Sequence, residues 1–256
     1  MARDDAIDFV GVSAVRTAVL QAVLDGGRRR RSLVDALDAS ESAVYAAVNA
    51  LAERRLVTTD DDVVRATGKG VVVAECLDRH ERMRAALEVD DRYWVRHDPS
   101  VIPARQRRFE ALAGAEVIRA ADHDPGRVTR VVAERIERAS WIRALAPVYH
   151  ERISEAVATV DDGRFVMDRE TVATHFDDPS ATDWPPQDVR IDDVPFALVL
   201  TDECLLLSLP RLDGSYDARS KLVAETDEAL AWGADCFEHV WDLATPLPEA
   251  FEGDGG

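Results

Sequence analysis

The chain has 256 residues, of which 31 are basic and 49 acidic, giving a formal net charge of −18. Its hydrophobic content of 46% is that of a folded globular protein and excludes a disordered chain. The longest nearly apolar runs, Val194–Leu200 and Cys204–Leu209, fall far short of the roughly 20 residues that a membrane-spanning helix needs. No apolar signal segment opens the sequence, and its three cysteines are far apart, so we expect a protein of the reducing cytoplasm.

Sequence patterns of common catalytic and cofactor sites are missing. The chain has no G-x-x-x-x-G-K-[ST] and no G-x-S-x-G, and the run Gly68–Val73 lacks the third glycine of G-x-G-x-x-G. No two of the six histidines lie within five residues of each other, so zinc-type spacing is absent. We therefore expect no enzyme, no metal and no cofactor. Only a site assembled from distant residues stays open.

The first ninety residues predict helices followed by a two-stranded wing and a long helix. The expected helices are Val12–Leu24, Ser32–Leu37 and Glu41–Arg54, the strands are Leu56–Thr59 and Val63–Arg65 around the turn Asp60–Asp62, and the long helix runs from a cap at Thr67 to about Leu87. Gly26-Gly27 ends the first helix, and the basic run Arg28–Arg31 leads into the second.

The expected helix 41–54 has two distinct faces. Its inward face is apolar (Val44, Ala47, Val48 and Leu51), and its outward face carries Ser42, Ala46, Asn49 and Glu53, flanked by Tyr45. Ser40 precedes it as a plausible N-cap.

In order and spacing these elements resemble the archaeal and bacterial winged helix-turn-helix regulators. The resemblance covers about 75 residues. It rests on Ser40-x-Ser42-Ala-Val-Tyr-x-x-Val48-x-x-Leu51-x-x-x-x-Leu56-Val57 and on Ala66-Thr67-x-x-Gly70. It implies that helix 41–54 is a recognition helix and that residues 1–90 form a DNA-binding domain.

The predicted DNA contacts follow from this placement. Small residues on the outward face allow a helix to enter the major groove, where Asn49 can pair with adenine, and Ser42 and Tyr45 can reach bases or phosphates. Arg28–Arg31 stand at a predicted helix N-terminus, where cationic side chains and the helix dipole both favour phosphate. The complete set of candidates is Arg28, Arg29, Arg30, Arg31, Ser40, Ser42, Tyr45, Ala46, Asn49, Arg54 and Arg65, with Lys69 as a further one. The acidic turn Asp60–Asp62 argues against a wing that enters the minor groove.

Residues 91–256 predict alternating helices and strands, so the whole fold is of the α+β class, with an N-terminal winged helix-turn-helix and a C-terminal α/β domain. Residues 88–100 are interpreted as a linker. The expected helices are Pro103–Leu112, Pro125–Ala139, Val148–Val160 and Asp227–Leu243, and the expected extended segments are Glu116–Ala120, Trp141–Leu145, Arg164–Met167, Val189–Ile191, Phe196–Leu200 and Leu205–Leu209.

This half resembles the middle domain of a methanogen filament-formation and methanogenesis regulator, which is common in haloarchaeal transcription factors. The matching segments include Asp124–Val128, Ile142–Val148, Arg164–Arg169, Asp193–Asp202, Gly214–Asp217 and Ala231–Glu238, over about 120 residues. More distantly it looks like the effector domain of TrmB-like sugar regulators. The resemblance implies a sensory or dimerising role.

Polar residues near the expected strand ends are candidates for a ligand site, because α/β sheets commonly bind ligands there. They are Asp168, Arg169, Tyr149 and His150, followed by Arg143, Arg190 and Tyr216. The alternative is that each is a cap, a turn residue or a surface charge. Trp232, Phe237 and Trp241 are assigned to the core or to a dimer interface.

The sequence therefore favours a DNA-binding transcriptional regulator that acts as a homodimer on a pseudo-palindromic operator, with a C-terminal domain that senses a small molecule or dimerises. The alternative is a protein-interaction adaptor with the same fold and no direct DNA reading, which the net charge and the acidic wing favour. The chain has only two lysines, Lys69 and Lys221, against 29 arginines, and 31 aspartates against 18 glutamates. This composition resembles that of salt-accumulating haloarchaea, with a high-GC genome as the alternative.

Overall fold

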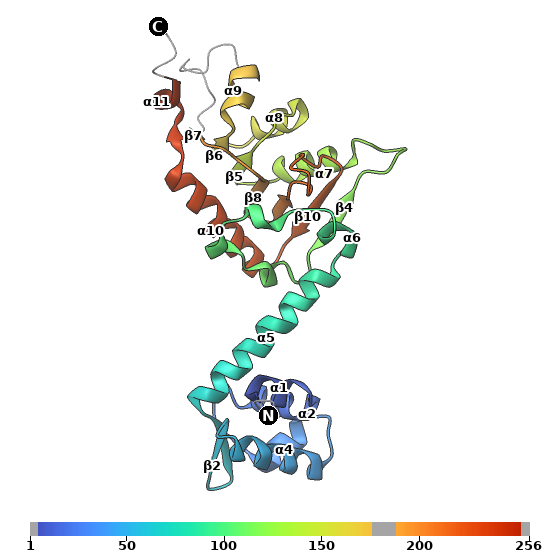
Figure 1. The fold of residues 1–256 in the computed structure, drawn as a ribbon, viewed down its shortest axis with the longest axis vertical. Coiled ribbons are helices and arrows are strands. Elements are labelled where there is room, and N and C mark those ends of the chain that lie inside the picture. Colours follow the sequence, from blue (N-terminus) through green and yellow to red (C-terminus); the bar gives the residue numbers. More distant parts are fainter. Residues whose placement is uncertain (1–4, 176–187, 252–256) are drawn as a thin grey trace. The chain divides into compact units, whose positions relative to one another are not determined.

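A computed structural model describes residues 5–175 and 188–251 of the chain (Figure 1). The chain divides into two compact units, residues 1–82 and residues 83–256. The division lies eight residues before the boundary expected at residue 90, because the first half of the following helix, α5 (Gly68–Glu88), packs in the first unit and its end in the second. Helix and strand occur in both units, and the fold class is α+β, as predicted.

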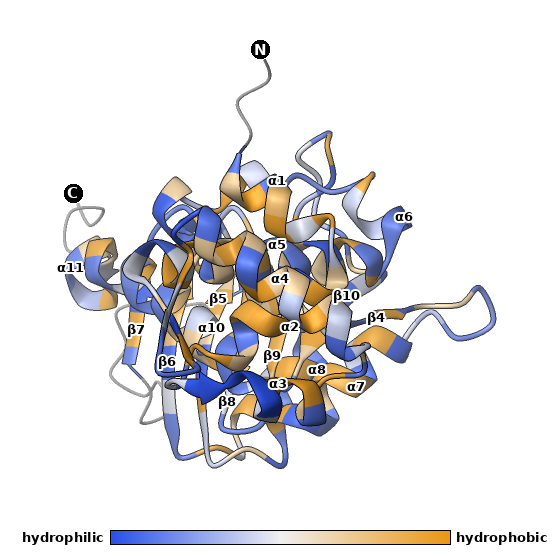
Figure 2. Ribbon diagram, turned by 90° about the horizontal axis from the view of Figure 1, so that it is seen from below, coloured by the Kyte–Doolittle hydropathy of each residue, from blue (hydrophilic) through white to orange (hydrophobic). Residues whose placement is uncertain are grey.

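The first unit is a helical bundle with a small sheet. Its elements are α1 (Ala6–Gly11), α2 (Ala14–Ala22), β1 (Arg28–Arg29), α3 (Arg30–Ala36), α4 (Glu41–Glu53), β2 (Val57–Asp60), β3 (Val63–Ala66) and the start of α5. Apolar side chains of α2, α4 and β3 meet in one core, among them Leu20, Val48, Leu51 and Val64. Figure 2 shows hydrophobic residues concentrated on α2 and α4. The predicted helices and wing strands are confirmed, and α1 is an additional helix.

The wing sheet has three strands in the order β1-β3-β2, not the two that were expected. Arg28 and Arg29 pair antiparallel with Val64 and Val63. Arg28 therefore lies in a strand before α3, whereas Arg29 belongs to β1 and is also the N-cap residue of α3, so the predicted place at a helix N-terminus holds from Arg29 onward. A two-residue edge strand of charged side chains has no hydrophobic alternation, so the sequence pattern could not show it.

The motif Thr67-x-x-Gly70 fastens α5 to the end of α4. The Thr67 hydroxyl donates to the carbonyl oxygens of Arg55 at 2.8 Å and Leu56 at 3.1 Å, and it accepts from the Gly70 amide at 3.1 Å. A Cβ atom on Gly70 would lie 2.1 Å from the Leu56 carbonyl oxygen, so the close approach requires glycine. The predicted cap at Thr67 is confirmed.

The second unit is built on a mixed eight-stranded sheet in the order β11-β7-β6-β5-β8-β9-β10-β4. Strands β5, β6 and β7 are parallel, and their other neighbours are antiparallel. The strands are β4 (Glu116–Arg119), β5 (Trp141–Ala146), β6 (Asp162–Met167), β7 (Asp188–Ile191), β8 (Ala197–Thr201), β9 (Leu205–Ser208), β10 (Ser220–Ala224) and β11 (Thr245–Pro246).

Helices cover both faces of this sheet. Its helices are α6 (Asp91–Trp94), α7 (Arg127–Ile136), α8 (Glu151–Val157), α9 (Arg169–His175), α10 (Asp227–Leu243) and α11 (Leu247–Phe251), with 3-10 turns η1 (Pro99–Val101), η2 (Ala104–Gln106) and η3 (Phe109–Leu112). One core contains residues of α7, α8, α9 and α11, and a separate core contains α10 and the segment before β4. Strand β8 is buried at every position because it is covered on both sides.

The second unit differs from the sequence-based expectation in several elements. Residues 88–100 are no linker, because Tyr93 in α6 is fully buried and its hydroxyl accepts from the Leu209 amide at 2.9 Å. Segment 103–112 forms short 3-10 turns where one α-helix was expected, and the helix expected at 148–160 is shortened to α8. Strands β10 and β11 and helices α9 and α11 were missed, since each is too short for its periodicity to be recognised.

Helix α10 matches its prediction at both ends. Thr226 caps it by accepting from the Ala229 amide, and Asp227 and Glu228 in the first turn favour the positive end of the helix dipole. Trp232, Phe237 and Trp241 are buried in the core. Of their two predicted assignments, core or dimer interface, the structure shows the core. In the described parts of the chain, no helix combines the length and the apolar character needed to cross a membrane.

Candidate functional site

The outward face of α4 is exposed and lined with small and polar side chains. Val44, Ala47, Val48 and Leu51 are buried beneath it, and Ser42, Ala46, Asn49 and Glu53 are exposed, as the spacing predicts. The Ser40 hydroxyl accepts from the Ala43 amide at 3.3 Å and lies 3.2 Å from the Ser42 hydroxyl, so Ser40 acts as the N-cap. A capped, packed helix holds this face in a fixed orientation.

Arg30 at the start of α3 lies beside this face. Its guanidinium donates to the Asn49 side-chain oxygen at 3.1 Å and stands 5.6 Å from the centre of the Tyr45 ring. Asp62 at the wing turn lies on its other side, with 3.8 Å between Arg30 Nε and Asp62 Oδ1. The structure thus brings together three predicted DNA-contact residues and one wing carboxylate. In Figure 2 the start of α3 is hydrophilic and its later part hydrophobic.

The remaining predicted DNA contacts are distributed around this cluster. Arg28, Arg29 and Arg31 are exposed on β1 and at the start of α3. The exposed Arg65 on β3 has its guanidinium against Gly27, where a Cβ atom would meet it at 2.7 Å. Arg54 is placed differently: its guanidinium lies 3.7 Å from the centre of the Phe9 ring on α1, and its carbonyl accepts from Lys69 Nζ at 3.0 Å.

The wing turn is an acidic hairpin. Asp61 and Asp62 have positive φ angles of 45° and 65°, the conformation of a tight turn between two twisted strands, where asparagine, aspartate and glycine are favoured. The Asp62 carbonyl also accepts from the Arg30 amide at 3.1 Å. The turn residues therefore hold Arg30 in place while adding negative charge at the wing.

In the second unit, Asp168 and Arg169 have structural partners. The Asp168 carboxylate accepts from the amides of Glu170 and Thr171 at the start of α9. Arg169 donates to the Ala250 carbonyl at 2.5 Å and stacks on the Phe251 ring at 4.5 Å. Asp168 is a helix cap, and Arg169 connects α9 to α11. Both predicted ligand residues therefore have structural partners within the protein.

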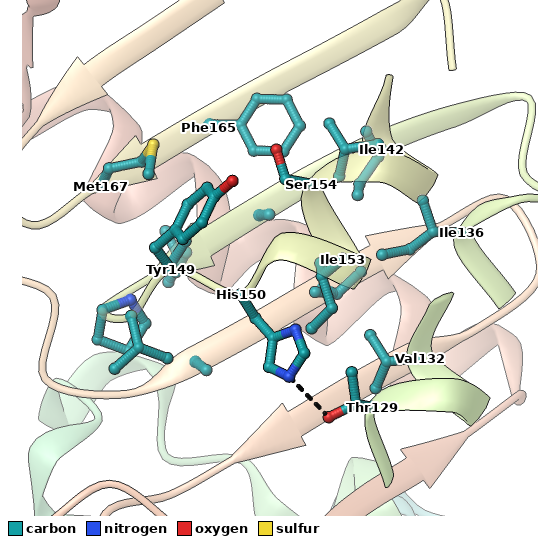
Figure 3. A pocket seen from close by; sticks show the side chains of 18 of the residues that line it. Thr129, Val132, Ile136, Ile142, Tyr149, His150, Ile153, Ser154, Phe165 and Met167 are labelled. Atoms are coloured by element: carbon teal, nitrogen blue, oxygen red, sulfur yellow. Dashed lines mark hydrogen bonds between the residues drawn. The ribbon is translucent and has the colours of Figure 1, made fainter. Parts of the chain in front are cut away.

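Tyr149 and His150 do line a cavity, which has a volume of about 530 Å³. It lies between the sheet and helices α7 and α8, with walls of Ile136, Ile142, Ile153, Phe165 and other apolar side chains (Figure 3). Tyr149 stacks on His175 with ring centres 4.6 Å apart, and His150 Nε2 lies 3.4 Å from the Thr129 hydroxyl. The sequence therefore located two residues of this cavity correctly, without locating the cavity itself.

Of the further polar candidates, Tyr216 also lines the cavity, whereas the two arginines do not. Arg143 pairs with Asp162 at 2.8 Å, and Arg190 lies over the Trp241 ring at 4.2 Å and donates to its carbonyl. Sequence reasoning missed Lys221, which lines the cavity and is 3% exposed. Burial lowers the pKa of Lys221 to about 8. The available signal was a lone lysine in the otherwise uncharged run Ser220–Ala224.

A buried polar cluster lies beside the strand that carries Lys221. Asp217 accepts from His97 Nε2 at 3.0 Å, from Arg211 at 2.8 Å and from the hydroxyl of Ser220. Burial alone would raise the pKa of Asp217, but these hydrogen bonds outweigh it and lower the pKa to about 2. Every member has a partner, so the cluster fastens the segment before β4 to β10. Among the described residues, no group of three or more His, Cys, Asp or Glu side chains could hold a metal ion.

Two families of protein domains match the chain. Residues 4–98 match the HVO_A0261 N-terminal domain, and residues 188–243 match the middle domain of the methanogenesis regulatory protein FilR1. The second match is the FilR1 middle-domain resemblance that the sequence motifs predict for the C-terminal half of the chain. The methanogenesis regulatory protein FilR1 of Methanothrix harundinacea (strain 6Ac) is 21% identical over 229 residues. That alignment covers 83% of this chain and 51% of FilR1, so the chain spans about half the length of this relative.

Solved structures with local similarity come from several kinds of protein. The archaeal chromatin protein TrmBL2 is 15% identical, with 94% of this chain and 100% of that chain covered and a TM-score of 0.39. An IclR transcriptional regulator from Alicyclobacillus acidocaldarius is 8% identical, with 96% and 98% covered and a TM-score of 0.24. CalO1, a methyltransferase of calicheamicin biosynthesis, is 19% identical, with 75% and 64% covered and a TM-score of 0.25.

Proposed function

We propose that this chain is a transcriptional regulator that binds double-stranded DNA through α4 and the residues around it. The observation that carries the proposal is the exposed face of α4, where Asn49 follows the small side chains of Ser42 and Ala46. A helix with such a face enters the major groove of about 12 Å width without steric conflict, and an asparagine amide there pairs with an adenine edge.

In this proposal Arg30 exchanges its bond to Asn49 for a bond to a DNA phosphate. It donates to Asn49 when DNA is absent, and it is close enough to the α4 face to exchange that bond for a phosphate oxygen. The exchange releases the Asn49 oxygen and leaves its amide group in place to bond an adenine. Arg28, Arg29 and Arg31 are exposed and contact phosphates, which fixes the position of the protein but carries no sequence information.

The test begins with selection of preferred sequences from random duplex DNA by the full chain at high potassium chloride concentration. Asn49→Ala should then weaken binding to the selected sequence by about 1–3 kcal/mol and relax the preference at one base pair. Replacing Arg28 and Arg29 with glutamine should weaken selected and random DNA alike and flatten the salt dependence. Arg105→Gln in the second unit is a control for loss of one positive charge. An Asn49→Ala loss equal on selected and random DNA would overturn the assignment.

We further propose that the regulator acts as a homodimer on two half-sites, with residues 91–256 serving as the effector domain. A single short helix contacts too few base pairs for specificity in a genome, so winged-helix proteins generally pair two half-sites about one helical turn apart. Val72 of α5 is 59% exposed, an apolar side chain available for packing against a second copy. Light scattering of the full chain that gave a mass near 28.3 kDa would refute the dimer.

A protein-interaction adaptor is the second candidate function. The net charge of −18 and the acidic turn Asp60–Asp62 support it, because both repel phosphate. The same selection experiment separates the candidates: failure to enrich any DNA sequence over a range of salt concentrations would favour the adaptor.

A further inference from the structure

The cavity of the second unit is built for an apolar body. Its floor is formed by side chains of β5, β6 and β8, and its roof by α7 and α8, including Val132, Ile136 and Ile153 (Figure 3). The lining residues reach from β7 to β10, which are five positions apart in the order of the sheet, so the cavity is elongated across the strands. A volume of about 530 Å³ is in the range of ordinary small-molecule sites.

Lys221 places one positive charge in this apolar wall. It is the second residue of β10, and its neighbours Ser220 and Leu222 point to the opposite face of the sheet. Among the described residues, no hydrogen bond or ion pair of its amine is present, and no charged group contributes to its altered pKa. A buried ammonium without a counter-ion costs free energy, and natural proteins tolerate that cost mainly where a charge has a task.

Among the residues that line the cavity, the polar side chain nearest to Lys221 in the chain is the neutral Tyr216. Tyr216 lines the cavity from the loop before β10, and burial raises the pKa of its hydroxyl, so the hydroxyl stays protonated at neutral pH. Arginine supplies 29 of the 31 basic residues of this chain, and lysine at position 221 is a marked exception. A compact ammonium is a point charge on a flexible stem, whereas the planar guanidinium fork matches a carboxylate or a phosphate at two points.

We propose that the cavity binds a monocarboxylate with an elongated apolar body, its carboxylate paired with the Lys221 ammonium and its body against α7, α8 and the sheet. One buried cation matches one negative charge, and Lys221 is the one Lys, Arg, Asp or Glu side chain among the described residues that line the cavity. Tyr216 donates a second hydrogen bond to the carboxylate. The inference depends on the proposed effector role of this domain only for its biological use, since binding itself is measured without DNA.

The test is titration calorimetry of the full chain with decanoate and with decanol, both below their micelle concentrations and without DNA. The first variant is Lys221→Met, which keeps the length of the side chain and removes its charge. The matched control is Lys69→Met, which changes the only other lysine, exposed in the first unit. The second variant is Ser154→Phe, which fills the cavity from α8 and leaves Lys221 unchanged.

We expect the wild-type protein and Lys69→Met to bind decanoate equally, and Lys221→Met to bind it at least about ten-fold more weakly, as loss of a buried charge-assisted contact requires. Decanol should bind the wild type more weakly than decanoate does, and Lys221→Met should leave decanol affinity unchanged or higher. Ser154→Phe should abolish binding of both. Tryptophan fluorescence confirms that the second unit, which contains the cavity, is folded in each variant.

Three results would overturn the proposal: no saturable binding of octanoate, decanoate or dodecanoate, equal affinity of Lys221→Met for decanoate, or decanoate binding that survives Ser154→Phe. A cationic chain such as decylammonium that bound better than decanoate would also contradict it. Because none of these measurements involves DNA, a failure of the proposed DNA reading leaves the result intact, and the reverse holds as well.

Discussion

Replacing Lys221 with methionine should stabilise the second unit at neutral pH. Burial lowers the pKa of Lys221 from 10.5 to about 8, so the native protein holds this proton less tightly than the unfolded chain does. At about 1.36 kcal/mol per pKa unit, the buried charge costs roughly 3 kcal/mol of stability at pH 7. Methionine is of similar length, uncharged and flexible, and it fits the apolar wall. We therefore expect Lys221→Met to raise the free energy of unfolding by up to about 3 kcal/mol at pH 7.

The pH dependence has a definite sign. Below pH 8 both states carry the proton and the native state bears the full cost. Between pH 8 and 10.5 the unfolded chain binds the proton that the native protein has released, so the stability of the wild type rises with pH relative to the variant. The advantage of Lys221→Met should shrink over this interval and vanish above it. Other groups titrate in both proteins and cancel in the difference.

The tryptophans make this measurement specific for the second unit. All five (Trp94, Trp141, Trp184, Trp232 and Trp241) follow residue 82, so their fluorescence reports unfolding of residues 83–256 alone. Urea denaturation of the wild type, Lys221→Met and the control Lys69→Met is followed at several pH values and constant high salt. A stability gain that does not change between pH 7 and pH 11, or a loss at pH 7, would refute the reasoning.

Three further changes test other parts of the molecule. Gly70→Ala should destabilise the first unit by about 1–3 kcal/mol, because its Cβ would lie 2.1 Å from the Leu56 carbonyl oxygen. The control Gly68→Ala, whose Cβ would have no atom within 4 Å, should leave the stability unchanged. Hydrogen exchange of α2 and α4 measures both. Asp217→Asn should lower stability by about 2 kcal/mol above pH 4, and the difference should disappear as the pH falls from 3.8 towards 2, because the lowered pKa of the native carboxyl stabilises only the ionised form. Asp62→Asn should strengthen DNA binding more than Asp61→Asn does. Both changes keep the turn and remove one negative charge, but of the two aspartates Asp62 is the one that pairs with Arg30. Equal affinities of the two variants in a gel-shift assay would count against a phosphate contact by Arg30.

The first unit could be predicted in detail because its signals are local. The faces of α4, the cap at Ser40 and the turn at Asp60–Asp62 each follow from residues within a few positions of one another. What the sequence could not show is contact between distant segments. The bond from Arg30 to Asn49 joins residues 19 positions apart, and it depends on β1, which has no pattern of its own.

Asp168 and Arg169, two of the four predicted ligand residues, do not line the cavity, for a related reason. The rule that ligands bind beyond the carboxyl ends of strands applies to open parallel sheets. Here only β5, β6 and β7 are parallel, and the chain turns directly from β6 into α9, whose first amides use the Asp168 carboxylate. The cavity lies instead between the sheet and two helices, and its lining comes from positions 128 to 221.

Lys221 is the residue of this site that could have been identified from the sequence alone. A short strand that is buried on both faces requires apolar residues at successive positions, and serine, leucine, valine and alanine at positions 220 and 222–224 fit that requirement. A lysine among them either reaches solvent with its amine or faces an internal space. This chain uses arginine at nearly every basic position, so its exposed positive charges are nearly all arginines. A lone lysine in an apolar strand therefore favours the internal space. The strand itself had to be recognised first, and five residues between polar loops are too few for that.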